Sequence, residues 1–344
     1  MTATKRRIDL ALRRIQKLFC ENDLPWYLGF SGGKDSTALV AAVYSALLSL
    51  PRPTKTITIL YCDTGVEIPI IAEYVRRTLV NISKQADKDG VPIRATIVKP
   101  HLNDGFFIKV IGNGYPPPTN KFRWCTDRLR IGPVRRIMKS SSNAPSIMLL
   151  GTRWEESPER TRTLERFRLN GDYYFKQAGN ANATIFAPLA DFSTRQIWDY
   201  LHSDGIPAFL NIPALDGFYK AANGKKCSGL CSDCADCTSV RFGCWVCTVV
   251  RKDRAVTNMV SDGYPELAPL LNFRNWIIGI RDKPHLRYKR RRNGDAGLGP
   301  FTLRTRRAIL ARLRKAEQAT RWQLLSSIEE KCIKHYWEID ARKS

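Results

Sequence analysis

Short apolar runs alternate with longer segments over the first half of the chain. The runs at residues 26–30, 56–61, 93–99 and 146–150 are rich in β-branched and aromatic residues, which is typical of buried strands. The segments between them include helical runs such as residues 38–48. Strands separated by helices predict an α/β fold with a doubly wound, mostly parallel sheet.

Helical periodicity also appears outside these strands. Apolar residues from Ile8 to Phe19 recur every three or four positions and predict a first helix packed on the core. Ser193 is placed to cap a short helix over residues 194–201, and a further helix is expected over residues 304–319. Residues 102–123, which include a Gly-Asn-Gly and a Pro-Pro-Pro sequence, predict an ordered lid or a connecting loop.

The domain organisation follows from these patterns and from shifts in composition. We expect a nucleotide-binding domain over residues 1–210, a cysteine-rich segment over 211–250 and a basic, mainly helical region over 251–344. No apolar run reaches the roughly 18 residues that span a bilayer, and residues 1–20 lack the uncharged core of a signal peptide. A cytoplasmic protein without a membrane partner is therefore expected.

Charge changes the functional expectation. The chain of 344 residues holds 56 Lys and Arg against 32 Asp and Glu, a formal net charge of +24 with a pI near 9.9. Residues 281–315 alone hold 13 basic and 2 acidic residues. A solvated charged face would explain one basic run, but an excess over the whole chain favours binding to the phosphate backbone of nucleic acid.

Cysteine spacing indicates a metal site. Six of the ten cysteines lie between residues 227 and 247, where Cys-x-x-Cys pairs can place two thiolates on one metal centre. From spacing alone, a structural zinc site and an iron-sulfur cluster are both open, because tetrahedral sulfur ligation suits either. The four histidines are scattered and receive no catalytic role.

Three expected strand ends carry residues suited to ligand binding. In open parallel sheets, ligands lie beyond the carboxyl ends of the strands. Ser31, Asp63 and Gly151 each follow such an end, so the sequence predicts that they meet in one cleft.

The segment after the first strand is a candidate phosphate-binding loop, reading Phe-Ser-Gly-Gly-Lys-Asp-Ser-Thr over residues 30–37. Gly32 and Gly33 let the backbone turn tightly, while the N–H groups that open the next helix, with Ser31 and Ser36, can bind an anion. A Gly-Gly turn capped by a polar side chain is the structural alternative.

This loop lacks the Gly-x4-Gly-Lys-Ser/Thr and Gly-x-Gly-x-x-Gly signatures. It resembles the PP-loop of the adenine nucleotide alpha-hydrolase superfamily, whose members cleave ATP between the α and β phosphates. The resemblance implies that six consecutive residues bind the pyrophosphate end of ATP: Ser31, Gly32, Gly33, Lys34, Asp35 and Ser36.

Three further segments share one resemblance. They read Tyr-Pro-Pro-Pro-Thr (115–119), Lys-Phe-Arg-Trp-Cys-Thr-Asp-Arg-Leu (121–129) and Arg-Phe-Gly-Cys-Trp-Val-Cys-Thr-Val-Val (241–250). From about residue 26 to residue 310, the chain resembles DndC-type proteins of bacterial DNA phosphorothioation and its restriction-modification systems, a branch of the PAPS-reductase-like PP-loop ATPases. The resemblance implies an ATP pyrophosphatase and sulfurtransferase that helps to replace a non-bridging phosphate oxygen of DNA with sulfur.

The resemblance also implies cofactors and partners. It implies ATP, Mg²⁺ and an iron-sulfur cluster, of the 4Fe-4S type, together with a cysteine desulfurase as sulfur donor and other phosphorothioation proteins. The cysteines that match the cluster ligands are Cys227, Cys237, Cys244 and Cys247. Cys231 and Cys234 are additional, and either can replace Cys227 as the first ligand.

Adenylation by ATP would turn a DNA phosphate oxygen into a good leaving group and would release pyrophosphate and AMP. The residues expected to take part in this chemistry are Lys34, Asp35, Asp63, Cys125 and Arg153. The remaining residues expected to contact the nucleotide are Thr64, Gly151, Ser157 and Arg160. A strand-end turn is the alternative for Asp63 and Thr64, and a surface salt-bridge network is the alternative for the Arg153 segment.

Cys125 lies outside the cysteine cluster, in an Arg-Trp-Cys-Thr sequence. A thiolate beside Arg123 and Arg128 is expected to have a lowered pKa, which suits a carrier of persulfide sulfur. The alternative is a small buried hydrophobic residue.

Two other functions remain open at this stage. A tRNA thiolase also combines a PP-loop with an iron-sulfur cluster and a basic surface. A non-catalytic, metal-stabilised DNA-binding module is the alternative from another class, although the intact Ser-Gly-Gly-Lys-Asp-Ser sequence argues against it. A PAPS reductase is disfavoured, because its C-terminal Glu-Cys-Gly-Leu-His segment is missing.

Overall fold

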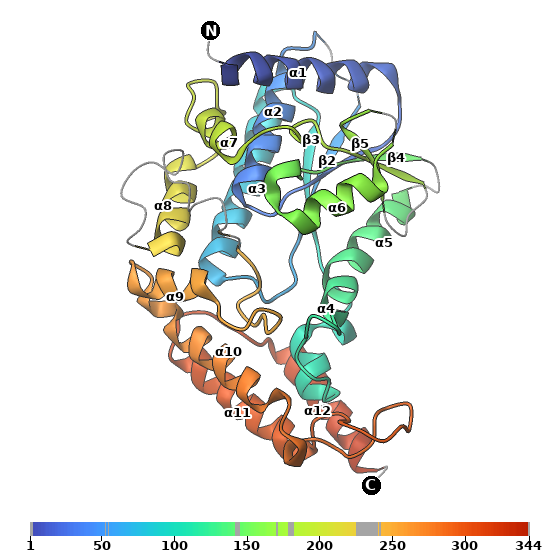
Figure 1. Cartoon of the computed structure of the whole chain (residues 1–344), viewed down its shortest axis with the longest axis vertical. Helices are drawn as coiled ribbons and strands as arrows, with labels where there is room; N and C mark the ends of the chain where they lie inside the picture. Colours follow the sequence, from blue (N-terminus) through green and yellow to red (C-terminus); the bar gives the residue numbers. More distant parts are fainter. Residues whose placement is uncertain are drawn as a thin grey trace. The chain divides into compact units, whose positions relative to one another are not determined.

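The strands of the described part of the chain form one six-stranded sheet in the order β3-β2-β1-β4-β6-β5 (Figure 1). The computed structural model describes residues 3–51, 53, 55–141, 145–169, 171–177, 182–224, 240 and 242–342. The strands are β1 (Trp26–Gly29), β2 (Ile57–Cys62), β3 (Ile93–Val98), β4 (Ser146–Leu149), β5 (Tyr174–Lys176) and β6 (Ala183–Phe186).

The predicted parallel sheet is confirmed. β1 pairs in parallel with β2 and β4, β2 with β3, and β4 with β6. Trp26 lies opposite Ile57 on one side and Ile147 on the other. The sequence analysis did not predict β5, a three-residue edge strand that runs antiparallel to β6.

Helices of eight or more residues account for most of the remaining described chain. They are α1 (Ala3–Glu21), α2 (Lys34–Leu48), α3 (Pro69–Asp89), α5 (Gly132–Ser141), α6 (Pro158–Phe167), α7 (Thr194–Leu201), α8 (Ile212–Asn223), α9 (Arg254–Ser261), α10 (Ala268–Arg281), α11 (Leu303–Gln318) and α12 (Ser327–Ala341). The predicted cap of α7 is present, since Ser193 closes a capping box with Gln196.

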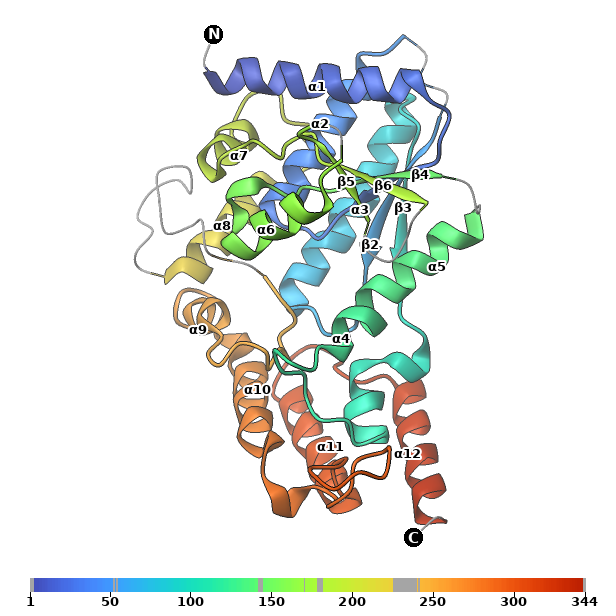
Figure 2. The ribbon, with the colours of Figure 1, turned by 45° about the vertical axis from the view of Figure 1, so that its right-hand side comes forward.

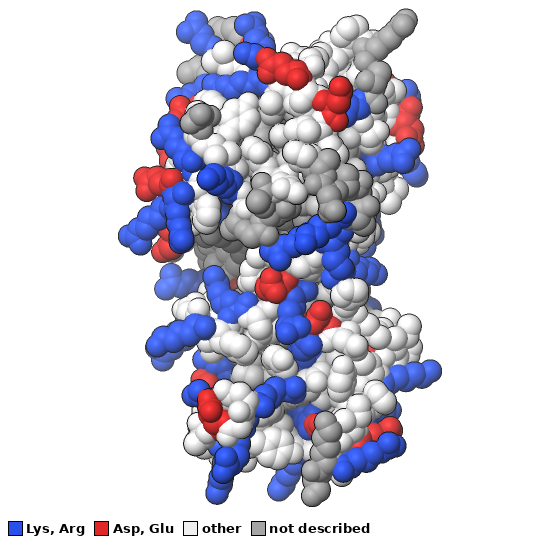
Figure 3. Space-filling view, turned by 90° about the vertical axis from the view of Figure 1, so that its right-hand side faces the viewer, with Lys and Arg blue, Asp and Glu red and all other residues white. Residues whose placement is uncertain are grey.

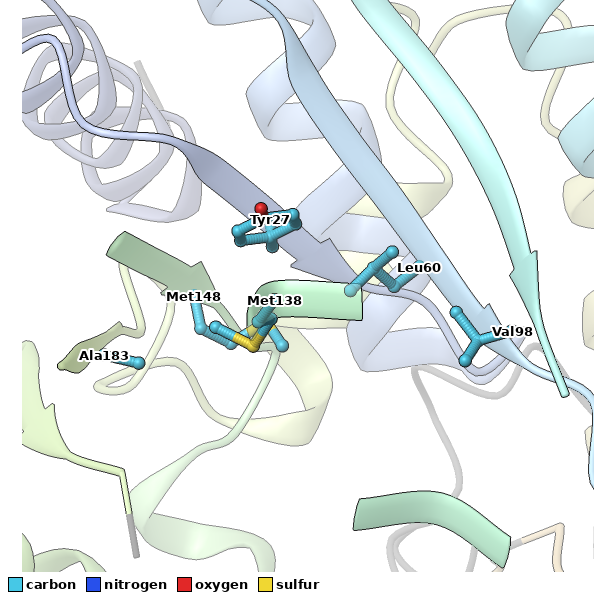
Figure 4. Close-up of a cluster of buried hydrophobic side chains, with 6 residues drawn as sticks. All are labelled: Tyr27, Leu60, Val98, Met138, Met148 and Ala183. Carbon is cyan, nitrogen blue, oxygen red and sulfur yellow. The ribbon is translucent and has the colours of Figure 1, made fainter. Parts of the chain in front are cut away.

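One face of the sheet packs on α5. Met138 of α5 lies against Tyr27 of β1, Leu60 of β2 and Met148 of β4 in a cluster of buried side chains (Figure 4). Val134 and Ile137 of the same helix pack against this cluster. Because side chains alternate across a strand, the neighbouring residues of β1 face the other way.

The opposite face of the sheet is covered by α1 and α2. Trp26 of β1 contacts Phe19 of α1 edge to face, with ring centroids 5.3 Å apart. Ala11 and Ile15 of α1 are fully buried, and α1 packs along α2 and α7. The predicted first helix on the core is confirmed, and helices on both faces make the sheet doubly wound (Figure 2).

Two compact units divide the chain. The first holds the sheet and comprises residues 1–62, 70–98 and 134–241, and the second comprises residues 63–69, 99–133 and 242–344. The boundaries that the sequence predicts at residues 210 and 250 stay predictions. In the second unit, the C-terminal part of the chain folds mainly into the helices α9 to α12.

Residues 102–123 are more helical than expected. A 3₁₀ turn covers Leu102–Asp104, and a π-helix covers Ile108–Gly112. Phe107, Ile108 and Ile111 are buried. Phe107 contacts Trp245 and Phe273, with ring centroids 6.0 and 6.4 Å apart, so this segment is part of an aromatic core within the second unit. Among the described residues, no helix is both long and apolar enough to span a membrane.

Candidate functional site

The loop between β1 and α2 makes a turn that only glycine can adopt. Gly32 has a φ of +76°. A Cβ atom added at Gly32 would lie 2.1 Å from Cγ2 of Val75 in α3, so the residue needs both the left-handed backbone and the missing side chain. Gly33 then caps α2 in an extended conformation. The loop is therefore held close to the start of the helix.

This turn presents hydrogen-bond donors at the N-terminus of α2. The N–H groups of Gly32, Gly33, Asp35 and Ser36 donate to no acceptor among the described residues. The hydroxyl oxygens of Ser31 and Ser36 lie 3.2 Å apart. Amide and hydroxyl donors at the positive end of a helix form an anion-binding site.

Charged side chains under the loop pair with one another. Oδ1 of Asp35 accepts from Nε of Arg153 over 2.6 Å, and Oδ2 lies 3.2 Å from Nζ of Lys34. Lys34 and Arg153 are only 3% and 1% exposed. Buried charges are tolerated when they are paired, so Asp35 holds both cations in place. In this conformation the Asp35 carboxylate faces the two cations, which leaves its backbone N–H available to an anion.

Gly151 and Arg153 reach the loop from the end of β4. A Cβ atom on Gly151 would lie 2.6 Å from the carbonyl oxygen of Asp35 and 3.0 Å from the Ser36 nitrogen. The predicted convergence of Ser31 and Gly151 on one site is thus borne out by geometry. Asp63 belongs to the second unit, and its convergence on the loop stays a prediction.

Residues outside the sequence motif complete this site. The Tyr219 hydroxyl of α8 accepts from the Lys34 N–H at 3.2 Å, and its ring lies 5.3 Å from the Lys34 Nζ. Arg153 also donates to the Phe192 carbonyl and to the Thr194 hydroxyl, each at 2.9 Å. The sequence analysis missed Tyr219, because no local motif marks it and it lies 185 positions from Lys34.

Ser157 and Arg160 have local partners. The Ser157 hydroxyl caps α6 by accepting from the Arg160 N–H at 3.3 Å. Nε of Arg160 lies 3.1 Å from Glu156. These contacts match the salt-bridge alternative, and the expected contact of both residues with a nucleotide stays a prediction.

Asp63 and Thr64 form a turn in the second unit. Oδ1 of Asp63 accepts from the Gly65 N–H over 3.1 Å, and Gly65 has a φ of +75°. The Thr64 N–H donates to Glu67, whose pKa is raised by burial. This is the strand-end turn considered above, and a role in binding metal or adenosine stays a prediction.

Two of the predicted cluster cysteines lie together in the second unit. The N–H of Cys247 donates to the carbonyl of Cys244 over 2.9 Å, which places both residues in one turn. The guanidinium of Arg130 lies 3.5 Å from Sγ of Cys244. Burial raises the pKa of Cys244 to about 11, although Arg130 acts in the opposite direction.

Cys227 and Cys237, with Cys231 and Cys234, lie outside the described residues. Within the described ranges, no three His, Cys, Asp or Glu side chains are grouped to hold a metal ion. The turn of Cys244 and Cys247 can supply two of the thiolate ligands of an iron-sulfur cluster. The Gly-rich cradle at α2 fits the phosphates of ATP.

The expected low pKa of Cys125 is wrong. Burial raises the pKa of this thiol, and Arg130 compensates only in part. The side chain of Arg128 does not lower the pKa of the Cys125 thiol, because its Nη1 pairs with Asp104 at 2.7 Å. The role of Cys125 in carrying sulfur stays a prediction and needs another means of forming the thiolate.

Basic side chains are widespread on the surface. On the face drawn in Figure 3, Lys and Arg are more numerous than Asp and Glu and are not confined to one patch. This agrees with the net charge of +24.

Comparison with known proteins places these observations in a family. The family model described as phosphoadenosine phosphosulfate reductase domain matches residues 25–250. An uncharacterized protein of Methanocaldococcus jannaschii is 25% identical over 183 residues, which are 53% of this chain and 32% of that protein. The chain thus spans about a third of the length of the curated relative that it matches.

Two solved structures are similar at a low level. Phosphoadenylyl-sulfate reductase from Candida auris, in a phosphate complex, has a TM-score of 0.38 and 13% identity, covering 61% of this chain and 88% of that one. The U34-tRNA thiolase NcsA from Methanococcus maripaludis, with its [4Fe-4S] cluster, has a TM-score of 0.38 and 10% identity, covering 80% of each chain.

Proposed function

The chain belongs to the phosphoadenosine phosphosulfate reductase domain family, and from this premise we propose that it is an ATP pyrophosphatase and sulfurtransferase of bacterial DNA phosphorothioation. In this proposal ATP is the substrate bound by the loop between β1 and α2, and a DNA backbone phosphate is the group that it activates. The charge of +24 favours a nucleic-acid partner, which in this proposal is DNA.

The observation that carries the proposal is the geometry of the loop. Gly32 cannot accept a side chain because Cγ2 of Val75 lies 2.1 Å from the place of its Cβ, and a Cβ on Gly151 would lie 2.6 Å from the Asp35 carbonyl oxygen. A turn of this kind brings a line of backbone N–H groups to the start of α2, where they can bind the β and γ phosphates. Such donors also stabilise the charge that develops on the departing pyrophosphate.

The reaction proposed has three balanced steps. An oxygen of the DNA phosphate attacks the α phosphorus of ATP, and the bond to the β phosphate oxygen breaks, releasing pyrophosphate. The outer sulfur of a cysteine persulfide, for which a cysteine desulfurase is the proposed source, then attacks the adenylated DNA phosphorus, and AMP leaves with the oxygen that attacked. A second thiol finally attacks the carrier cysteine sulfur, so that the S–S bond breaks, the transferred sulfur stays on phosphorus, and the two thiols form a disulfide.

Cys244 and Cys247 are the described members of the proposed cluster site, with Cys227 and Cys237 as the other ligands. An iron-sulfur cluster, when bound, supplies thiolate-ligated iron and electron transfer. The Arg130 guanidinium lies 3.5 Å from the Cys244 sulfur and offsets part of the rise in pKa that burial causes, so it would favour the thiolate form that ligation needs.

The first test identifies the products of ATP. Purified protein with ATP, Mg²⁺ and DNA is expected to form AMP and pyrophosphate, and formation of ADP and orthophosphate would refute the assignment. Replacing the exposed Ser31 by Ala is expected to raise the KM for ATP about tenfold, which is the loss of one hydrogen bond to a charged group. Ser49→Ala, at the other end of α2, is the control.

The second test identifies the modified nucleic acid. Nucleic acids from a strain with the gene and from a deletion strain are digested and compared by mass spectrometry. A phosphorothioate dinucleotide that disappears on deletion supports the proposal, whereas loss of a thionucleoside from tRNA would point to the thiolase alternative. DNA binding without AMP or pyrophosphate would indicate a non-catalytic module.

The third test addresses the metal. Anaerobic purification is expected to yield a coloured protein with iron and sulfide in equal amounts, as in a 4Fe-4S cluster. A colourless protein that contains zinc would contradict this part of the proposal.

A further inference from the structure

The helix α11 carries two groups of basic residues with different surroundings. Arg306 and Arg314 form ion pairs with carboxylates of the second unit. Arg306 is 1% exposed and lies 2.5 Å from Asp340, while Arg314 pairs with Glu317 and Glu330. Asp340, Glu317 and Glu330 therefore neutralise these two arginines.

The outward group has no such partners. Arg304, Arg307, Arg312 and Lys315 are all exposed, and none of them forms an ion pair with a carboxylate of the described chain. Their spacing of 3, 5 and 3 residues places them on one side of the helix, over about 16 Å of its length. We call these four side chains the α11 outer face.

The surroundings of this face add no negative charge along α10. This helix packs beside α11 and has no acidic residue in its sequence from Ala268 to Arg281 (Figures 1 and 2). The exposed residues of α11 that lie between the four cations are Ala308 and Ala311. A surface helix that served only for solubility would intersperse both signs of charge.

This arrangement costs the helix stability. Arg304 lies in the first turn, where the helix dipole favours acidic side chains, and α11 has no acid there. Arg304 with Arg307, and Arg312 with Lys315, are like-charged neighbours three residues apart, and each pair repels. A bound polyanion would make the electrostatic contribution of these cations favourable.

Two tryptophans hold the arginines of this face. The Arg312 guanidinium lies 5.2 Å from the ring of Trp276 in α10, and that of Arg307 lies 5.9 Å from the ring of Trp337 in α12. Both distances are within the range of cation–π contacts. The indole of Trp337 is itself tied to the Ile111 carbonyl over 2.8 Å. The tryptophans thus orient cations and are not arranged as free stacking platforms for single-stranded bases.

We propose that the α11 outer face is a binding surface for the phosphate backbone of duplex DNA. The four cations contact phosphates without reading bases, and the tryptophans reduce the rotamer entropy lost on binding. The inference rests on the proposed function for the choice of DNA among polyanions. The charge pattern and the tryptophan contacts are independent of the nucleotide site.

The test measures the affinity for duplex DNA by fluorescence anisotropy at salt concentrations from about 50 to about 200 mM. The slope of log K against log salt concentration reports how many phosphates the protein neutralises, because binding releases counterions. The variant combines Arg304→Gln, Arg307→Gln, Arg312→Gln and Lys315→Gln. Loss of four phosphate contacts is expected to make the slope of log K against log salt shallower by about three to four. The corresponding Arg→Lys variant at the three arginines should keep the slope.

A control variant removes the same charge from another exposed helix face. It replaces Lys5, Arg6, Arg13 and Lys17 of α1 by Gln, and all four are exposed. If this control lowers the slope as much as the α11 variant, binding depends only on net charge and the inference fails. It also fails if the α11 variant binds DNA normally, or if wild-type protein prefers tRNA or anionic phosphatidylserine vesicles to duplex DNA.

The same preparations separate this inference from the proposed function. AMP and pyrophosphate formation is measured at saturating ATP and at a DNA concentration high enough to saturate each variant. An α11 variant with normal products and reduced salt slope supports the surface, even if the DNA is never sulfur-modified. If the α11 variant keeps the wild-type salt slope and forms AMP and pyrophosphate, only the proposed DNA surface is wrong. If its salt slope is reduced but no AMP or pyrophosphate forms, even in the wild type, only the proposed chemistry is wrong.

Discussion

Arg153 donates from Nε to Oδ1 of Asp35 over 2.6 Å, which ties the end of β4 to the first turn of α2. Because Arg153 is 1% exposed and also bonds Phe192 and Thr194, its guanidinium has a fixed position. Its role in this structure is to hold the phosphate-binding loop through Asp35.

Replacing Arg153 by Ala is expected to lower the free energy of unfolding by about 3–5 kcal/mol, because the Asp35 carboxylate loses its fully buried partner. Arg153→Lys keeps the charge but cannot bond Asp35, Phe192 and Thr194 at once. It should therefore restore part of the stability but little of the rate of pyrophosphate release. Urea unfolding and product assays check both. Arg168→Ala, which breaks an exposed pair, is the control and should cost at most about 1 kcal/mol. Equal losses in Arg153→Ala and the control would contradict the assignment.

Replacing Gly32 by Ala should abolish nucleotide binding. Its new methyl group would meet Val75 at 2.1 Å, and the left-handed backbone at a φ of +76° adds about 1–2 kcal/mol of strain. Gly90→Ala is a matched control, since Gly90 has a φ of +67° with nothing within 4 Å of its Cβ position. Calorimetric titration with a non-hydrolysable ATP analogue is the measurement. Wild-type affinity in Gly32→Ala would show that the loop does not bind the phosphates.

Replacing Tyr219 by Phe removes the acceptor of the Lys34 N–H while keeping the ring near Nζ. A buried donor without its partner costs about 1–3 kcal/mol, so thermal unfolding should occur at a lower temperature. Tyr200→Phe, at another buried tyrosine of this unit, gives a comparison away from the loop. If Tyr219→Phe changes neither stability nor the KM for ATP, α8 has no part in the site.

Asp104 predicts a dependence of stability on pH in the second unit. Burial raises the pKa of its carboxyl, but hydrogen bonds from Arg128 and Lys109 outweigh burial and leave the pKa below its usual value. A carboxyl with a lower pKa in the folded state stabilises the fold above its unfolded pKa of about 4, and this contribution is lost as the pH falls through the folded value. Asp104→Asn should therefore lower the free energy of unfolding at pH 7. It should also reduce the difference in the free energy of unfolding between pH 7 and strongly acidic solution.

Urea titrations of wild type and Asp104→Asn at several pH values measure this effect. Lys109 and Arg128 contact the Asp104 carboxylate at 3.2 and 2.7 Å. Arg128→Gln should therefore reproduce part of the change in pH dependence that Asp104→Asn causes. A pH profile of the Asp104→Asn variant parallel to that of wild type would show that the carboxyl contributes no linkage.

The strands and the phosphate-binding loop were predictable from the sequence because their signals are local. β1 to β4 lie within a residue or two of the expected runs, and the Gly-Gly pair that begins the turn is contiguous with Ser31 and close to Ser36. The confirmed parallel pairing follows from alternating strands and helices, since parallel strands need crossover connections.

Other features were not predictable, because they depend on residues far apart in the chain. Arg128 was expected to lower the pKa of Cys125, three residues away, but it pairs with Asp104 across 24 positions. The apolar residues of 106–111 could not be distinguished from a loop, because a short run does not show which surface will cover it. The cysteines at 227 and 237 lie outside the described residues, so their ligation remains a prediction.

The amino-acid sequence by itself determined the parallel sheet, the Gly-Gly turn and the excess of basic residues, because each depends on neighbouring positions or on composition. Only the tertiary structure decided that Arg153 bonds Asp35, that Tyr219 accepts from Lys34, and which arginines of α11 form ion pairs. Side chains 118 and 185 positions apart meet only after the helices pack on the sheet. Packing also decides which charges are paired and which remain exposed, since burial makes an unpaired charge costly.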